Sequence, residues 1–196
     1  LLGFIRSLTE QDITAIQFIK TERQDVMVRL VESFGDQKRT VDAPLLSDGT
    51  LRVLAVGATL LTAPEKALVV IEEIDNGVHP SRAELLVQQI RRIATDRKLR
   101  VLLTSHNPAL LDALPDESLA DVVSCYRDPH GDSRLVRLGD MDRYPELVAQ
   151  GPLGQLMTRR VLDRFVKDTR TPQDRQAKAT QGLATLQAPA DDSEGL

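Results

Sequence analysis

The sequence contains few of the residues on which several common classes of protein depend. Its 196 residues include one cysteine, Cys125, so no disulfide can form within the chain, and we expect a reducing, cytoplasmic setting. One cysteine and three scattered histidines also give no ligand spacing for a zinc site. No apolar run approaches the roughly 20 residues of a membrane helix, so we expect no membrane partner.

A phosphate-binding loop is missing as well. The pattern Gly-x-x-x-x-Gly-Lys-Ser/Thr holds nucleotide phosphates through its backbone N–H groups and its lysine. No lysine of this sequence follows a glycine; the lysines are Lys20, Lys38, Lys66, Lys98, Lys167 and Lys178. The sequence therefore supplies no cradle of this kind for the phosphates of a nucleotide.

The charges are nearly balanced, with 25 lysines and arginines against 29 aspartates and glutamates. A net charge of −4 predicts no general nucleic-acid-binding surface. A local group of cations at Arg159, Arg160 and Arg164 is more simply interpreted as the solvated face of a helix. The apolar content of 41% is enough to build a folded core.

The apolar patterns predict an α/β chain with a largely parallel sheet flanked by helices. Alternation over residues 24–32 predicts a strand, followed by a turn and a second short strand. Beyond Ser47, apolar residues recur at helical spacing, which predicts a deeply buried helix. The runs ALVVI (67–71) and RVLLTS (100–105) suit central parallel strands covered on both faces. An amphipathic helix from Pro80 to about Arg97 separates these strands, as in other alternating α/β domains.

The C-terminal third predicts smaller elements. Asn107 followed by Pro108 is a typical helix start. Two strands, DVVSCYRD and SRLVRL, flank a PHGD turn, and a helix is expected from about Pro152 to Val166. The composition then becomes polar and rich in alanine and glutamine, which predicts one domain over residues 1–167 and a disordered polar tail over 168–196.

Two carboxylates, Glu72 and Glu73, directly follow the aliphatic run 67–71. Open α/β sheets bind ligands at the carboxyl ends of their strands. Burial of two acids there is costly unless a cation compensates, and Mg²⁺ beside phosphate is a good candidate. The alternative is a strand that simply ends in solvent-exposed acids.

His106 follows the run 100–105 in the same way. If the two strands are neighbours, its ring would lie beside the carboxylates and could donate a hydrogen bond to a phosphoryl oxygen or to an attacking water. The alternative is a histidine that merely helps to cap the following helix.

Ser47, Asp48 and Gly49 open the buried helix. A serine cap with glycine in the first turn leaves free backbone N–H groups at the positive end of the helix dipole, which is an anion site. The alternative is an ordinary helix cap.

Together these segments resemble a known set of motifs. LLSDGT, LVVIEEIDNGVHP and LLTSHNP, in this order between Leu45 and Pro108, are similar to the signature, the Walker B motif with its D-loop, and the switch histidine of ABC-type ATPases. The pattern is most like that of predicted AAA-family ATPases that share a catalytic core with the SMC, RecF and overcoming-lysogenization-defect proteins. The resemblance implies the C-terminal lobe of a P-loop NTPase, with ATP and Mg²⁺ as cofactors.

The resemblance also implies roles for individual residues. Glu72 corresponds to the acid that holds Mg²⁺, Glu73 to the base that polarises the attacking water, and His106 to the histidine that senses the γ-phosphate. Ser47, Asp48 and Gly49 correspond to the signature, which reaches across a dimer to the nucleotide on the other protomer. Asn76 to His79 would form the D-loop at the same dimer contact.

Three positions depart from the pattern. Asp48 stands where transporter-type signatures have glycine, and it places a negative charge close to a phosphate site. Ile74 replaces the proline that is common after the acid pair. The D-loop ends in His79-Pro80, as in the overcoming-lysogenization-defect branch, and not in the Leu-Asp of transporters.

These observations predict an ATPase that acts as a homodimer or with a partner of a larger complex, with nucleic acid contacted through that complex. DNA repair and anti-phage defence are the settings that the resemblance implies. The chain is expected to be incomplete by itself, because the phosphate loop must come from upstream or from another chain. The main alternative is a non-hydrolysing regulatory or dimerisation subunit. A nuclease or nucleic-acid-binding domain is disfavoured, because no acid cluster exists beyond Glu72 and Glu73 and the sequence lacks a basic surface.

Overall fold

The computed structural model describes residues 1–20, 22, 24–168, 170, 173–174, 176–177 and 180. In chain order the elements are α1 (Leu2–Leu8), β1 (Asp12–Lys20), β2 (Val26–Phe34), β3 (Gln37–Asp42), η1 (Ala43–Leu45), α2 (Asp48–Thr62), β4 (Leu68–Ile71), η2 (Pro80–Arg82), α3 (Ala83–Asp96), β5 (Arg100–Leu103), α4 (Pro108–Asp112), α5 (Asp116–Leu119), β6 (Val123–Arg127), β7 (Ser133–Arg137), η3 (Leu138–Asp140), α6 (Tyr144–Val148), α7 (Leu153–Thr158) and α8 (Val161–Val166). Most of the tail predicted over 168–196 lies outside the described residues.

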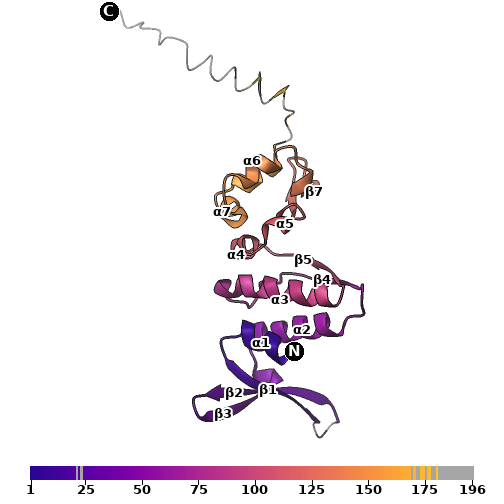
Figure 1. Ribbon diagram of the computed structural model, residues 1–196, viewed down its shortest axis with the longest axis vertical. Helices are drawn as coiled ribbons and strands as arrows, with labels where there is room; N and C mark the ends of the chain where they lie inside the picture. Colours follow the sequence, from indigo (N-terminus) through magenta and orange to yellow (C-terminus); the bar gives the residue numbers. More distant parts are fainter. Residues whose placement is uncertain are drawn as a thin grey trace, which may run out of the picture.

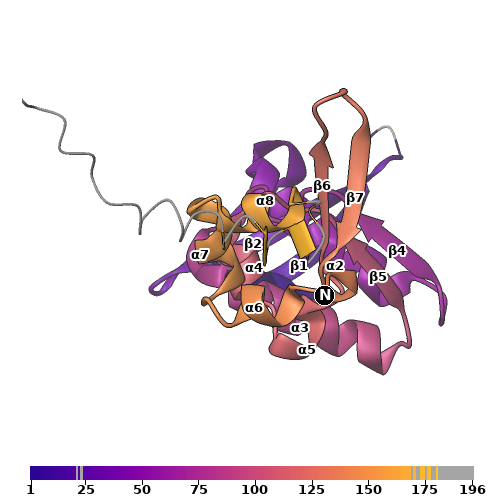
Figure 2. The same ribbon diagram turned by 90° about the horizontal axis from the view of Figure 1, so that it is seen from above.

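The elements are stacked along the long axis of the molecule (Figure 1). The sheet β1–β2–β3 forms one end, and helices α1, α2 and α3 lie next to it. The pair β4–β5 follows, and α4 to α7 with the β6–β7 hairpin occupy the other half (Figures 1 and 2). The C-terminal half is thus spatially separate from the N-terminal sheet.

The prediction of a largely parallel sheet is wrong for the described residues. They form three separate sheets, of which only β4–β5 is parallel, while β1–β2–β3 and β6–β7 are antiparallel. The physical reason is connection length: only a few residues separate β1 from β2, β2 from β3 and β6 from β7, and a parallel pair needs a crossover of a dozen or more residues. The parallel strands β4 and β5 are joined by such a crossover, which contains α3.

The β4–β5 pair is covered on one face only. Val69 and Ile71 point into the core, whereas Leu68, Val70 and Leu102 are 55%, 54% and 53% exposed. Val70 and Leu102 are direct cross-strand neighbours, so the exposed residues form one apolar patch. The prediction that both faces are covered was therefore wrong: α2 and α3 pack on one face, and no described element covers the other.

Two hydrophobic clusters organise the packing. The first joins α1, α2, α3, β4 and the inner face of the N-terminal sheet, with Ile5, Leu60 and Leu86 almost fully buried. The second contains Leu138, Leu147, Leu153, Leu156, Leu162 and Val166 and holds the C-terminal helices together. Helix α4 lies between them, because Leu110 belongs to the first cluster while Leu111 packs against the second.

The helix predicted over 152–166 is two short helices. Arg160 adopts a left-handed conformation with φ of 58°, which ends α7 and begins α8 in a new direction. Among the residues that the structure describes, no helix has the length and the apolar character needed to cross a membrane.

Candidate functional site

The start of α2 is held by its own side chains. Ser47 is the N-cap: its Oγ accepts the backbone N–H of Thr50 at 3.2 Å and lies 2.9 Å from the Thr50 hydroxyl. Thr50 is buried, while Ser47 and Asp48 are exposed. The first turn of this helix is therefore fixed from inside and open to solvent outside, as an anion site requires.

Gly49 places this turn directly on the loop that follows β4. A Cβ atom on Gly49 would lie 2.4 Å from the carbonyl oxygen of Gly77, and a Cβ on Gly77 would lie 2.3 Å from the Cα of Gly49. Gly77 also has φ of 80°, which disfavours any side chain. The signature segment and the predicted D-loop are therefore in backbone contact, and both glycines are needed for it.

The ends of β4 and β5 are tied together by Thr104. Its hydroxyl accepts the Glu73 N–H at 2.9 Å, its carbonyl accepts the Ile74 N–H at 3.0 Å, and its own N–H donates to the Ile71 carbonyl. Glu73 has φ of 46°, an unusual conformation for a residue with a side chain. Three hydrogen bonds thus hold the backbone around the acid pair against the neighbouring strand.

Asn76 orients the second acid. Its Nδ2 donates to Glu73 Oε2 at 2.5 Å, so one carboxylate oxygen is occupied within the loop. Glu72 and Glu73 are both exposed, so the carboxylates are not buried as a pair. The expectation that the two acids are buried is therefore wrong, and burial gives no reason for a cation beside them.

The two predicted histidines differ in their surroundings. His79 caps η2, with its Nδ1 2.8 Å from the Ser81 hydroxyl and 3.3 Å from the Ser81 nitrogen. His106 is exposed, and the cap of α4 is the neighbouring Asn107, whose Oδ1 accepts the Ala109 N–H at 2.9 Å. Capping therefore does not account for His106, whereas it does account for His79.

Sequence reasoning missed Arg52. Its guanidinium reaches from α2 to the Glu72 carbonyl oxygen, and its Nε is buried without a partner within the described residues. The same holds for Asp75 Oδ1, just beyond the acid pair. Arg52 lies one turn after Gly49 in a mostly apolar helix. A charged residue at this position was the feature of the sequence that could have indicated its role.

Thr104 was also missed. It precedes His106 by two residues, and its bonds to Glu73 and Ile74 could not be inferred before β4 and β5 were known to be adjacent.

The structure thus brings the predicted segments to one edge of the β4–β5 pair. The start of α2 touches the loop after Glu73, and Thr104 links that loop to the strand that precedes His106. No hydrogen bond joins His106 to either acid among the described residues. Within the same residues there is no group of three or more histidine, cysteine or acidic side chains that could hold a metal by itself.

The chain is thus a mixed α/β protein with polar groups at the carboxyl ends of two parallel strands and at a helix N-terminus, the edge at which open α/β sheets bind ligands. Comparison with solved structures indicates the fold more closely. A chain from work on the ATP-driven dimerization and DNA-stimulated activation of SMC ATPases superposes with a TM-score of 0.52 at 8% identity, covering 76% of this chain and 86% of that one.

A second similar structure is the Smc head domain with an extended coiled coil bound to the C-terminal domain of ScpA, from Pyrococcus furiosus. It has a TM-score of 0.48 and 14% identity, and the match covers 76% of this chain and 36% of that one. No curated protein sequence matches the chain.

The family assignment comes from the sequence match over residues 4–112, more than half of the chain. The chain belongs to the family described as "AAA domain, putative AbiEii toxin, Type IV TA system". The match begins in α1 and ends with α4, so it includes every residue of the candidate site.

Proposed function

We propose that this chain supplies the signature, Walker B and switch-histidine half of an ATP-hydrolysing site. The observation that carries the proposal is the convergence of three segments on one edge, made by the Gly49–Gly77 backbone contact and the Thr104 hydrogen bonds. Membership of an AAA-domain family supports it.

Hydrolysis would be an in-line attack of water on the γ-phosphate, in which positioning and charge neutralisation supply most of the rate. Glu73 is the proposed base. Because Asn76 occupies its Oε2, the other oxygen remains to accept a proton from water. His106 would donate a hydrogen bond to a phosphoryl oxygen.

The residues fit a magnesium site only in part. Glu72 is an exposed, hard oxygen ligand, and Mg²⁺ is commonly held by one or two carboxylates together with substrate phosphates. When bound, the ion would neutralise charge on the phosphates. The described residues hold no group of three or more possible ligands, so the ion would also need ligands from the phosphates and from the loop that binds them.

A phosphate-binding loop must come from outside these 196 residues, either from the same polypeptide or from another one. The apolar patch of Leu68, Val70 and Leu102 supports this part of the proposal. Apolar residues of a central strand are normally covered on both faces, so this patch offers a surface for the lobe that carries the loop.

The signature residues would act on the nucleotide of a second protomer. Ser47, Asp48 and Gly49 lie at an exposed helix start, with Asn76 in the adjoining loop and His79 shortly after it. The Asp48 carboxylate would repel the phosphate at this contact, so we expect the phosphate to lie farther from Asp48 than from Ser47 and Gly49. DNA repair or anti-phage defence is the proposed setting.

The first test uses the complete protein, including its phosphate loop, and the substitution Glu73→Gln. The amide keeps the shape and the Asn76 contact but cannot accept the proton, so turnover should fall by on the order of 10²–10⁴-fold while ATP binding persists. Phosphate release and nucleotide binding are measured on the same preparation. Turnover equal to that of the unchanged protein would remove Glu73 from the role of base.

The second test is Ser47→Arg, assayed by ATP-dependent dimerisation in analytical ultracentrifugation. A long cation at the exposed helix start should block the approach of a second protomer. Ser47→Thr is the matched control, because threonine retains the hydroxyl cap of α2. A dimer that still forms with ATP in Ser47→Arg would contradict the role across the interface.

A second candidate function is a non-hydrolysing regulatory or dimerisation subunit. The exposure of both acids favours it, since neither carboxylate is committed to a buried site. A complete protein that dimerises with nucleotide but hydrolyses no ATP even with Glu73 unchanged would select this alternative.

A further inference from the structure

Helix α8 and the residues on either side of it carry a group of exposed cations in the C-terminal half of the molecule. Arg160, Arg164 and Lys167 are exposed: Arg160 precedes α8, Arg164 lies within it and Lys167 follows it. With Arg170, Asp163 and Asp168 they line an open depression of about 630 Å³. We call these six residues the α8 basic depression.

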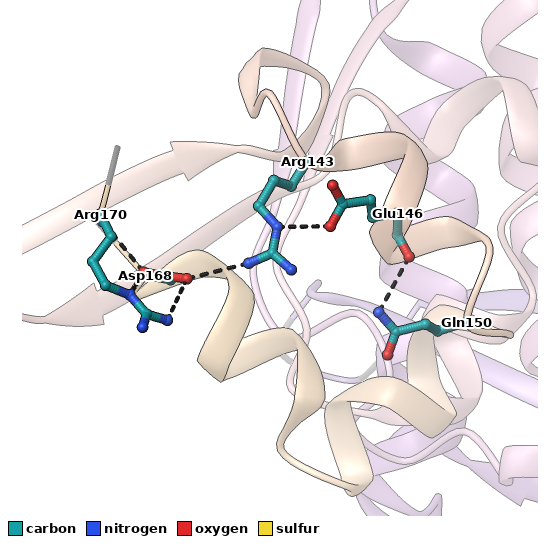
Figure 3. Close-up of polar contacts among 5 residues, drawn as sticks. All are labelled: Arg143, Glu146, Gln150, Asp168 and Arg170. Atoms are coloured by element: carbon teal, nitrogen blue, oxygen red, sulfur yellow. Dashed lines mark hydrogen bonds and ion pairs between the residues drawn. The ribbon is translucent and has the colours of Figure 1, made fainter. Parts of the chain in front are cut away.

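A buried carboxylate organises this depression. The Asp168 side chain is only 8% exposed, and it accepts hydrogen bonds from Arg170 at 2.6 and 2.8 Å and from Arg143 at 3.2 Å (Figure 3). Arg143 in turn stacks on the Phe165 ring at 4.3 Å and bonds Glu146. Two guanidinium groups are thereby fixed around one carboxylate, and a fixed cation loses less entropy when it binds an anion.

The charges in the depression do not cancel. Arg160 and Arg164 make no ion pair among the described residues, and Lys167 pairs with the exposed Asp163 at 3.0 Å and lies 5.6 Å from the centroid of the Tyr126 ring. An exposed pair of this kind is weak, so Lys167 can exchange its partner for another anion at little cost. Four cations and two carboxylates line the depression, and Asp174 also acts on Arg170, so a smaller excess of positive charge remains on a chain with a net charge of −4.

The surroundings favour a nucleic-acid backbone over a membrane surface. A helix that lies on a membrane presents an apolar face to the lipid. Here the apolar side of α8, with Leu162 and Val166, is buried in the second hydrophobic cluster, and Phe165 lies under Arg143. What remains outside is charged, and rows of arginine and lysine bind phosphates of either strand without reading bases.

We propose that the α8 basic depression binds the sugar-phosphate backbone of DNA without sequence preference. The residues concerned are separate from the candidate ATP site, so the proposal stands or falls independently of hydrolysis. It assigns to this chain itself a contact that the sequence alone predicted only through a larger complex.

The test measures binding of a short fluorescent DNA duplex by anisotropy over a range of salt concentrations, in the absence of nucleotide. The double substitution Arg160→Gln/Arg164→Gln should weaken binding on the order of tenfold or more. It should also reduce the slope of log K against log salt by about 2, because each phosphate that an arginine neutralises contributes roughly 0.9 to that slope.

The matched control is Arg39→Gln/Arg92→Gln, which removes the same charge from two exposed arginines on β3 and α3. It should leave affinity and slope nearly unchanged. Arg160→Lys/Arg164→Lys should retain most of the binding and the full salt slope, and it separates loss of charge from damage to α8.

Three results would overturn the proposal: no DNA binding at low salt, an equal loss in the control pair, or an unchanged salt slope in the glutamine pair. Vesicles of anionic phospholipid serve as the competing surface. If they bind more tightly than DNA and with the same dependence on Arg160 and Arg164, the occupant is a membrane and the assignment to nucleic acid is wrong.

Discussion

At the scale of single residues, the contact between Gly49 and Gly77 determines whether the signature segment can reach the loop after β4. We predict that Gly49→Ala destabilises the protein by about 1–3 kcal/mol, because its methyl group must displace backbone and not a movable side chain. Urea unfolding followed by circular dichroism measures this change.

Gly3→Ala is the control for that substitution. A Cβ at Gly3 in α1 meets nothing within 4 Å, so alanine there should be neutral or stabilising by up to about 1 kcal/mol. Equal effects at the two positions would show that the close approach of Gly49 to Gly77 does not govern stability.

Helix caps could be predicted from the sequence, whereas side-chain contacts between distant residues could not. Ser47 and Asn107 are caps as expected, because a cap depends on residues within one helical turn. Arg52 and Thr104 were missed because their partners, the Glu72 carbonyl and the Glu73 N–H, are 20 and 31 residues away in sequence. Long-range polar contacts of this kind leave no local pattern.

At the scale of elements, α2, α3 and the strands β4 to β7 were predicted close to their observed bounds, since helical apolar spacing, short aliphatic runs and turn residues are local signals. Helix α1 and strand β1 were not predicted. The break at Arg160 was missed because a left-handed arginine is decided by packing and not by propensity. The open face of β4 was missed for a similar reason: the pattern shows which residues are apolar, but not which element covers them.

The β6–β7 hairpin supplies a prediction on pH. Asp128 accepts the backbone N–H groups of His130 and Asp132 and pairs with Arg134, and the bond from Arg134 is the main reason that the pKa of Asp128 is lowered. A lowered folded-state pKa adds stability above the ordinary pKa of about 3.9, and this contribution is lost as the pH falls through the folded value.

We therefore expect Asp128→Asn to lower the melting temperature near neutral pH. The difference from the unchanged protein should shrink as the pH falls from about 4 through the lowered folded-state pKa of Asp128. Thermal melts across pH test this, with Asp132→Asn, which loses only a longer 3.8 Å contact with Arg134, as the comparison on the same turn; its effect should be smaller. A difference that stays constant down to acid pH would show that the charge of Asp128 does not stabilise the turn.

At the scale of the whole molecule, the one-sided β4–β5 pair is the feature that most needs a partner. Leu102 is 53% exposed and Leu86 is 1% exposed. The effect of glutamine at Leu102 should therefore depend on whether the lobe with the phosphate loop is present, whereas its effect at Leu86 should not. Leu86→Gln should unfold this chain in any form, because a polar side chain in the core costs several kcal/mol.

Leu102→Gln should change the unfolding free energy of the 196-residue chain by no more than about 0.5 kcal/mol, as is usual for a surface position. In the form that carries a phosphate-binding loop, the same change should cost about 1–3 kcal/mol, because the amide would then be buried without a partner. It should also weaken ATP binding. Chemical denaturation of both forms measures the difference. Equal and small effects in the two forms would mean that the apolar patch stays open to solvent, and the lobe with the phosphate loop would then have to dock elsewhere on the chain.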